Sequence, residues 1–184
     1  MKKKYCIIGT GRQGTAAAYD LLVHADVESL TLLDCNQNSI DECLKKIDSV
    51  SNSVKIQQFI IDFNKTDQLK QLLDSVDIFL SSVPYKYNLM LTELAIETAC
   101  SMVDLGGHTG NVIKQLNYDK EAKKKGITIV PDCGMGPGMN VSMGLLAIEQ
   151  FDEAHEVRIW DGGLPQNPVK PWNYSLFFNI AGLT

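Results

Sequence analysis

The sequence predicts an α/β protein built on a doubly wound parallel sheet, and two observations support this fold class. Short apolar runs alternate with longer amphipathic segments as far as Val130, which is typical of the βα units that build a parallel sheet. Within each run, apolar residues do not alternate with polar ones. Strands that helices bury on both faces have this pattern.

Six short runs are expected to form the strands: Tyr5–Ile8, Leu30–Leu33, Phe59–Ile61, Ile78–Leu80, Met102–Leu105 (interrupted by Asp104) and Ile127–Val130. The segments between them are expected to be helical over Arg12–Val23, Ser39–Ile47, Asp67–Asp74, Leu89–Cys100 and Val112–Lys125. Pro131–Gly138 holds three glycines and two prolines, so neither a helix nor a strand should pass through it. A helix from Met139 to about Gln150 and a strand over His155–Trp160 should follow.

Composition and charge exclude several classes of protein. The chain has 184 residues, of which 45% are hydrophobic and 21% charged, as in a globular protein with a core. Its formal net charge of −5 disfavours binding to nucleic acid or to an anionic membrane. The five cysteines show no metal-ligand spacing, and no apolar stretch reaches transmembrane length. We therefore expect a cytoplasmic protein with reduced thiols, no metal site, and neither a nucleic-acid nor a membrane partner.

A glycine-rich loop follows the first expected strand and opens the first expected helix. Its residues are Gly9, Thr10, Gly11, Arg12, Gln13 and Gly14, the GxGxxG pattern of a Rossmann-type dinucleotide site. Gly9 permits a tight turn, Gly11 lets the backbone approach a pyrophosphate, and Gly14 allows close packing of helix against strand. The helix N-terminus favours the phosphate charge.

Asp34 ends the second expected strand, 20 residues after Gly14 (34 − 14 = 20). A carboxylate there accepts hydrogen bonds from the adenosine ribose and repels a 2′-phosphate. Cys35–Asn38 contains no Arg or Lys to bind such a phosphate, so we expect NAD rather than NADP. Asp62, after the third strand, either bonds the adenine edge or is a helix cap or a solvated turn residue.

The remaining candidates follow the fourth, fifth and sixth strands. With strand order 3-2-1-4-5-6, Ser82, Val83 and Pro84 should line the nicotinamide half of the cofactor. Tyr85 either contacts the substrate or packs as a wall. His108 either transfers a proton at neutral pH or lies near the start of the next helix. Asp132 and Cys133 either line the substrate pocket or belong to a hinge.

Several of these motifs resemble those of the saccharopine dehydrogenase family, most closely its lysine 6-dehydrogenase-like members. They are GTGRQG at Gly9–Gly14, Asp34, VPY at Val83–Tyr85, VDLGGH at Val103–His108, ITIVPDCGMGPGM at Ile127–Met139 and GGLP at Gly162–Pro165. The resemblance implies oxidation of the CH–NH or CH–NH2 group of an amino acid. In lysine-type members hydride passes from the side-chain Cε to NAD and the imine hydrolyses to an aldehyde. Saccharopine-type members act on a secondary amine joining two amino acids. Tyr85 and His108 are then candidates for substrate positioning and proton handling.

The resemblance also implies a division into two domains. Residues 1–138 would form the NAD-binding Rossmann domain, and residues 139–184 the beginning of a truncated α+β substrate and dimerisation domain. Aromatic residues gather near the end of the chain (Trp160, Trp172, Tyr174, Phe177 and Phe178), which favours a homo-oligomer. We expect the chain to bind NAD but to turn over lysine poorly. The alternative is a noncatalytic NAD-binding regulatory module, which would need neither the Gly/Pro loop nor these aromatic residues.

Overall fold

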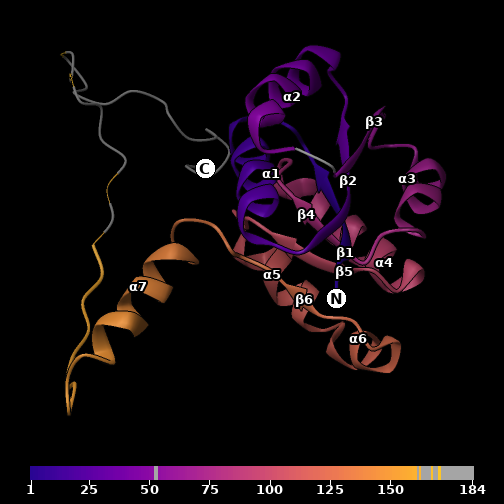
Figure 1. Ribbon diagram of the computed structural model, residues 1–184. Coiled ribbons are helices and arrows are strands. Elements are labelled where there is room, and N and C mark those ends of the chain that lie inside the picture. The colour runs from indigo at the N-terminus through magenta and orange to yellow at the C-terminus, as the bar shows by residue number, and fades with distance from the viewer. Residues whose placement is uncertain (52–53, 161, 163–166, 168–169, 171–184) are drawn as a thin grey trace. The chain divides into compact units, whose positions relative to one another are not determined.

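Six parallel strands form a single sheet in the first part of the chain, with helices on both of its faces (Figure 1). The computed structural model describes residues 1–51, 54–160, 162, 167 and 170. They belong to two compact units, Met1–Asp132 and a second that begins at Cys133. The division falls at the start of the Gly/Pro loop, whereas the boundary expected at residue 138 lies at its end.

The strands stand in the order β3-β2-β1-β4-β5-β6, as predicted for a doubly wound sheet. Their bounds are β1 (Lys3–Ile8), β2 (Val27–Asp34), β3 (Lys55–Ile60), β4 (Ile78–Ser81), β5 (Ser101–Asp104) and β6 (Ile129–Val130). The topological switch point lies between β1 and β4, which pair in parallel register from Tyr5 against Ile78 to Ile8 against Ser81. Ligands of such sheets bind beyond the carboxyl ends of the strands at this point.

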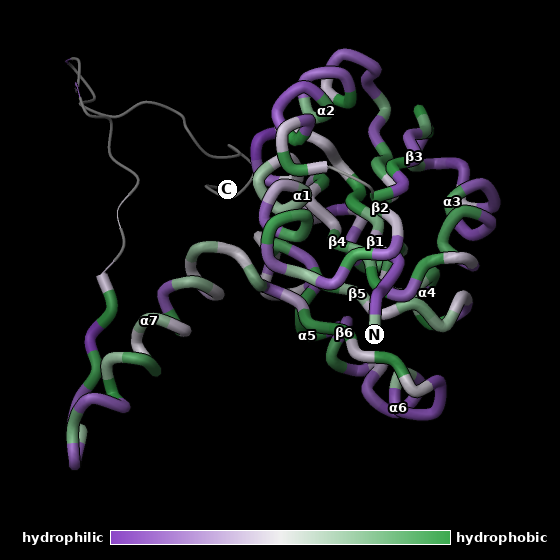
Figure 2. The backbone as a smooth tube through the Cα atoms, viewed as in Figure 1, coloured by the Kyte–Doolittle hydropathy of each residue, from purple (hydrophilic) through white to green (hydrophobic). Residues whose placement is uncertain are grey.

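Successive residues of β1 enter opposite layers of the core. Ile7 packs with Ala18 of α1 and Ile47 of α2, whereas Ile8 packs with the cluster that includes residues of α3 and α4. Both isoleucines are fully buried, and each contributes about 1.5–3 kcal/mol from burial. Figure 2 shows hydrophobic residues along the strands and hydrophilic ones along outer helices such as α6.

The helices of the sheet unit are α1 (Arg12–His24), α2 (Gln37–Ser51), α3 (Thr66–Leu73), α4 (Asn88–Thr98), α5 (Thr109–Leu116) and α6 (Asp119–Lys125), with a 3-10 turn at Tyr85–Tyr87. The single helix predicted over Val112–Lys125 is wrong, because α5 and α6 are separate. The backbone N–H groups of Asn117 and Tyr118 bond three residues back instead of four, which ends α5. The N–H of Ala122 then bonds the carbonyl of Tyr118 and starts α6.

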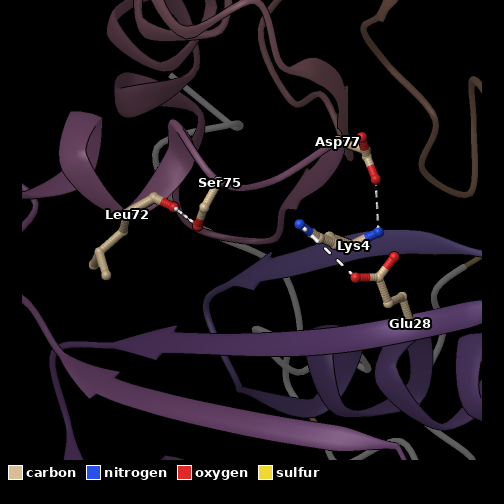
Figure 3. Close-up of polar contacts among 5 residues, drawn as sticks. All are labelled: Lys4, Glu28, Leu72, Ser75 and Asp77. Carbon is tan, nitrogen blue, oxygen red and sulfur yellow. Dashed lines mark hydrogen bonds and ion pairs between the residues drawn. The ribbon is translucent and has the colours of Figure 1, made fainter.

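Polar contacts fix the edge of the sheet opposite the switch-point loops (Figure 3). The backbone N–H of Lys4 donates to Asp77 Oδ2 at 2.8 Å, which joins the start of β1 to the residue before β4. Lys4 Nζ lies 3.8 Å from Glu28 Oε1 on β2. Ser75 Oγ donates to the carbonyl of Leu72 near the end of α3.

The second unit contains α7 (Met139–Ile148), which begins directly after the Gly/Pro loop. A bridge between Gly134 and Gly138 closes the loop, so no helix or strand passes through it, as predicted. The strand predicted over His155–Trp160 is wrong, because these residues pair with no strand of the described chain. Trp172, Tyr174, Phe177, Phe178 and most of the GGLP motif lie outside the described residues. None of the described helices combines the length and the apolar character needed to cross a membrane.

Candidate functional site: the carboxyl edge of the sheet

The glycine loop connects β1 to α1 and leaves room for a ligand at one position only. Gly9 has a φ of +93°, and a Cβ there would lie 2.9 Å from the carbonyl oxygen of Ser82. A Cβ on Gly14 would overlap the carbonyl oxygen of Gly9. A Cβ on Gly11, by contrast, would meet nothing within 4 Å. Gly9 and Gly14 therefore build the turn, and Gly11 faces open space, as the predicted approach of a pyrophosphate to its backbone requires.

Asp34 is held by the glycine loop itself. Its Oδ2 accepts the backbone N–H of Thr10 at 2.7 Å and the Thr10 hydroxyl at 3.0 Å, and its Oδ1 accepts the N–H of Asn36 at 2.9 Å. The carboxylate is 8% exposed. Since a carboxylate has about four acceptor positions, one remains for a ribose hydroxyl. Arg12 and Gln13 are exposed at the start of α1, within reach of solvent.

Asp62 lies beyond the end of β3 in a solvated turn. Its Oδ1 accepts the backbone N–H of Asn64 at 3.0 Å and the Asn64 side-chain amide at 2.9 Å. These are the bonds of the turn alternative, so the adenine contact stays a prediction.

The segment Ser82–Tyr85 connects the glycine loop to the loop after β5. Ser82 Oγ lies 2.5 Å from the carbonyl oxygen of Gly9 and 3.1 Å from that of Ile8, and donates to them. Val83 Cγ1 lies 2.9 Å from the position of a Cβ on Gly9. Pro84 then leads into the 3-10 turn that presents Tyr85. The predicted nicotinamide-side residues therefore border the glycine loop.

Tyr85 and His108 stack on each other, with ring centroids 5.1 Å apart and planes 24° from parallel. Gly107, which precedes His108, has a φ of +112°, a conformation that favours glycine, and the position of a Cβ there lies 3.4 Å from Tyr85 Cδ1, at ordinary contact distance. The side chain of Asn111 donates to the carbonyl of Tyr85 at 3.0 Å, which ties α5 to the same turn. The structure thus brings together the two residues that the sequence selected separately.

His108 is also the N-cap of α5, because its Nδ1 accepts the backbone N–H of Asn111 at 3.2 Å. A neutral imidazole that accepts through Nδ1 carries its hydrogen on Nε2. In this arrangement His108 can donate a hydrogen bond through Nε2.

Sequence reasoning missed a buried carboxylate, Asp104, at the end of β5. It is fully buried and accepts from three donors: the N–H of Gly106 at 2.7 Å, the N–H of Asp132 at 3.2 Å and the side-chain amide of Gln115 at 2.7 Å. The available signal was an acidic residue inside an apolar run, because a buried charge needs several partners. In the described part of the chain, no three His, Cys, Asp or Glu side chains form a metal-binding group.

Comparison with known proteins identifies the family. Residues 5–130 match the family model described as the saccharopine dehydrogenase NADP binding domain. The chain belongs to the saccharopine dehydrogenase family. The resemblance of the motifs to this family is thereby confirmed, and so is the dinucleotide-binding fold.

Two relatives are similar to this chain over most of its length. Rat mitochondrial alpha-aminoadipic semialdehyde synthase is 24% identical over 191 residues, which cover 99% of this chain and 19% of that protein. Yeast saccharopine dehydrogenase [NADP(+), L-glutamate-forming] is 24% identical over 132 residues, 67% of this chain and 28% of that one. The chain thus spans about a fifth to a quarter of the length of these relatives.

Solved structures agree on the fold. Apo saccharopine dehydrogenase from Saccharomyces cerevisiae superposes with a TM-score of 0.64 at 21% identity, over 83% of this chain and 31% of that one. The WlbA dehydrogenase from Bordetella pertussis, solved with NADH and UDP-GlcNAcA, gives a TM-score of 0.57 at 12% identity, over 82% and 43%. At these identities the likeness establishes the architecture alone.

Proposed function

We propose that the chain binds NAD and serves an oxidoreductase that acts on the CH–NH or CH–NH2 group of an amino acid. The observation that carries this proposal is the continuous path along the carboxyl edge of the sheet. It runs from the glycine loop, where Ser82 and Val83 contact Gly9, to the stacked Tyr85 and His108. A dinucleotide site at one end and two hydrogen-bonding side chains at the other suit such a reaction.

The residues of the loop fit a bound dinucleotide, because Gly11 leaves open the space that a Cβ would fill. When bound, the nicotinamide supplies the acceptor for a hydride from the amine carbon. The chain's own residues then orient the substrate: His108 donates from Nε2, and the Tyr85 hydroxyl offers a second hydrogen bond. Saccharopine is a candidate substrate because the yeast relative is named a saccharopine dehydrogenase. Lysine is the second candidate, from the resemblance of the motifs alone.

The choice of NAD over NADP rests on charge. Asp34 places a carboxylate beside the loop, and Cys35–Asn38 carries no cation that would bind a 2′-phosphate. Repulsion of the phosphate should therefore outweigh any gain. The family model and the yeast relative are named for NADP, so this preference distinguishes the present chain from them.

Titration calorimetry with NADH and NADPH tests the proposal. We expect NADH to bind at least about tenfold more tightly, a difference of about 1.4 kcal/mol. The isosteric variant Asp34→Asn removes the charge and should narrow the ratio to within about threefold. Tighter binding of NADPH by the wild type would refute the NAD preference. Binding of neither nucleotide by the folded chain would refute the cofactor site itself.

We further propose a cytoplasmic, self-associating protein with a small amino-acid substrate. Support for the compartment comes from the thiols, since no disulfide joins the five cysteines, all of which lie in the described residues. Self-association is proposed from apolar side chains on α7, where Met143 and Leu146 are each 62% exposed.

A noncatalytic NAD-binding regulatory module is the second candidate. The cap that His108 forms on α5 favours it, because a structural task alone would explain this imidazole. The two candidates differ in whether His108 contributes to binding of the nicotinamide half.

A further inference from the structure

Two carboxylates from different strands meet at the turn that carries His108. Asp104 ends β5, and Asp132 follows β6. Asp104 Oδ1 accepts the backbone N–H of Asp132 at 3.2 Å and that of Gly106 at 2.7 Å. The fully buried Asp104 therefore fixes the backbone on both sides, at the start of the turn and at Asp132.

The side chain of Asp132 in turn lies over the glycines of this turn. Gly106 has a φ of +73°, and a Cβ there would overlap the Asp132 carboxylate. Asp132 Oδ1 accepts the backbone N–H of Gly107 at 3.3 Å. Asp132 has a φ of +61°, a left-handed conformation that Asp and Asn tolerate better than most residues. The Asp132 side chain can therefore occupy this place only because residue 106 is glycine.

Gly107 connects Asp132 to the aromatic pair. It lies between Gly106 and His108 in the chain, and the position of its missing Cβ is 3.4 Å from the Tyr85 ring. A shift of the Gly107 backbone would therefore displace His108 from the stack directly.

We propose that Asp132 is a positioning residue that acts through the Gly107 N–H to hold the Tyr85–His108 stack beside the cofactor loop. The catalytic meaning of this role rests on the proposed function. The hydrogen bond needs an acceptor and not a negative charge, so an amide oxygen at the same place should serve equally well.

Three substitutions separate these requirements. Asp132→Gly removes the carboxylate and keeps a residue that adopts a positive φ without strain. Asp132→Asn keeps the acceptor and also tolerates this φ. Asp77→Gly is the matched control, because Asp77 likewise accepts a backbone N–H, that of Lys4, but at the opposite edge of the sheet (Figure 3).

The readout is the NMR signal of the His108 ring, with and without NADH. We expect Asp132→Gly to shift this signal and to abolish its response to NADH, while NADH affinity falls by no more than about threefold, as for a variant without the imidazole. Asp132→Asn and Asp77→Gly should keep both the wild-type signal and its response. Unchanged His108 signals in Asp132→Gly would overturn the proposal. Loss of the wild-type signal in Asp132→Asn would also overturn the proposal, because the negative charge of Asp132, and not its hydrogen bond, would then hold the stack.

A second measurement does not depend on whether Asp132→Gly folds. In the wild type, the Gly107 amide should exchange with deuterium at least about tenfold more slowly than its unprotected rate. Exchange at the unprotected rate would overturn the proposal. If NADH binds the wild type without any response at His108, the proposed function fails at this pair, whereas the apo signals still decide the role of Asp132.

Discussion

The two halves of the sheet's carboxyl edge are built in different ways. On the β1–β2 side, one loop of six consecutive residues provides the turn and the open space, and Asp34 locks it through Thr10. On the β4–β6 side, the stack of Tyr85 and His108 depends on three separate segments, the third of which contributes Asp132. The first half is one continuous loop that neighbouring strands hold in place, and the second exists only when three strands are in register.

This difference has a consequence for mutation. A change in the glycine loop acts on the loop itself, so its effect depends on the space around a single Cα. A change near the aromatic pair acts through backbone that other segments hold. The first half should therefore show large, position-specific effects, and the second smaller effects that spread to neighbouring residues.

Gly14→Ala and Gly11→Ala should produce the largest effects and the sharpest contrast. The methyl group at position 14 overlaps the carbonyl of Gly9, so we expect a loss of at least about 2 kcal/mol of folding stability and no measurable NADH binding. The methyl group at position 11 meets no atom within 4 Å. The folding stability of Gly11→Ala should therefore stay within about 1 kcal/mol of wild type. The small loss arises because Gly11 is the N-cap of α1, a position where Ala is less favourable than Gly.

Affinity then separates the two glycines. Gly11→Ala should bind NADH at least about tenfold more weakly although it is folded, because the methyl group enters the pyrophosphate space. Urea unfolding and calorimetry measure the two quantities. Wild-type affinity in Gly11→Ala would show that the open space beside Gly11 is not the phosphate site.

His108 offers a test of intermediate size on the other half. Asn at position 108 is a good N-cap and keeps a side-chain acceptor for the Asn111 N–H, whereas Ala leaves it only the backbone carbonyl of residue 108. We expect His108→Ala to cost about 1 kcal/mol of stability and His108→Asn less than about 0.5 kcal/mol.

The same variants distinguish an enzyme from a regulatory module. If the imidazole lies along the nicotinamide half, His108→Asn should lower the affinity for NADH about threefold. The affinity for ADP-ribose, which lacks the nicotinamide, should not change. If the variant binds NADH as tightly as the wild type does, and ADP-ribose likewise, the result would favour the regulatory module.

The smallest expected effect concerns Cys35, the exposed thiol next to Asp34. In a Cys133→Ser background at pH 8, iodoacetamide should modify Cys35, and NADH should slow this reaction about threefold by covering it. Burial raises the pKa of Cys100 to about 12 and that of Cys6 well above its usual value. A raised pKa lowers the thiolate fraction at pH 8, so these two thiols should stay unmodified in the folded protein.

Mass spectrometry of the tryptic peptides reads out all three cysteines at once. Fast modification of Cys6 or Cys100 at pH 8 would contradict their burial. An undiminished rate at Cys35 under saturating NADH would place the adenosine away from Asp34.

Much of the fold was predictable because its signals are local. Buried strands are visible in the sequence as apolar runs, and the glycine motif at Gly9–Gly14 predicted both the first βα turn and the phosphate side of the site. The errors occurred where local signals were weak. Nothing in Val112–Lys125 breaks a helix as strongly as proline, yet the chain turns at Asn117 and Tyr118, where Tyr118 Oη donates to Glu93 on α4 at 2.7 Å. The apolar alternation over His155–Trp160 fits the pattern of a strand, but no strand in the described part of the chain pairs with it.

The sequence by itself determined the family and the position of the glycine loop, because their motifs consist of residues close together in the chain. It also determined the order of the strands, through the fold class that the alternation of strands and helices predicts. Only the tertiary structure decided that Asp34 bonds Thr10, that Tyr85 stacks on His108, and that His108 caps a helix. It alone brought Asp104 and Asp132 to the same turn, 28 positions apart in the chain (132 − 104 = 28). The physical reason is that parallel strands place their carboxyl ends at one edge whatever the chain length between them.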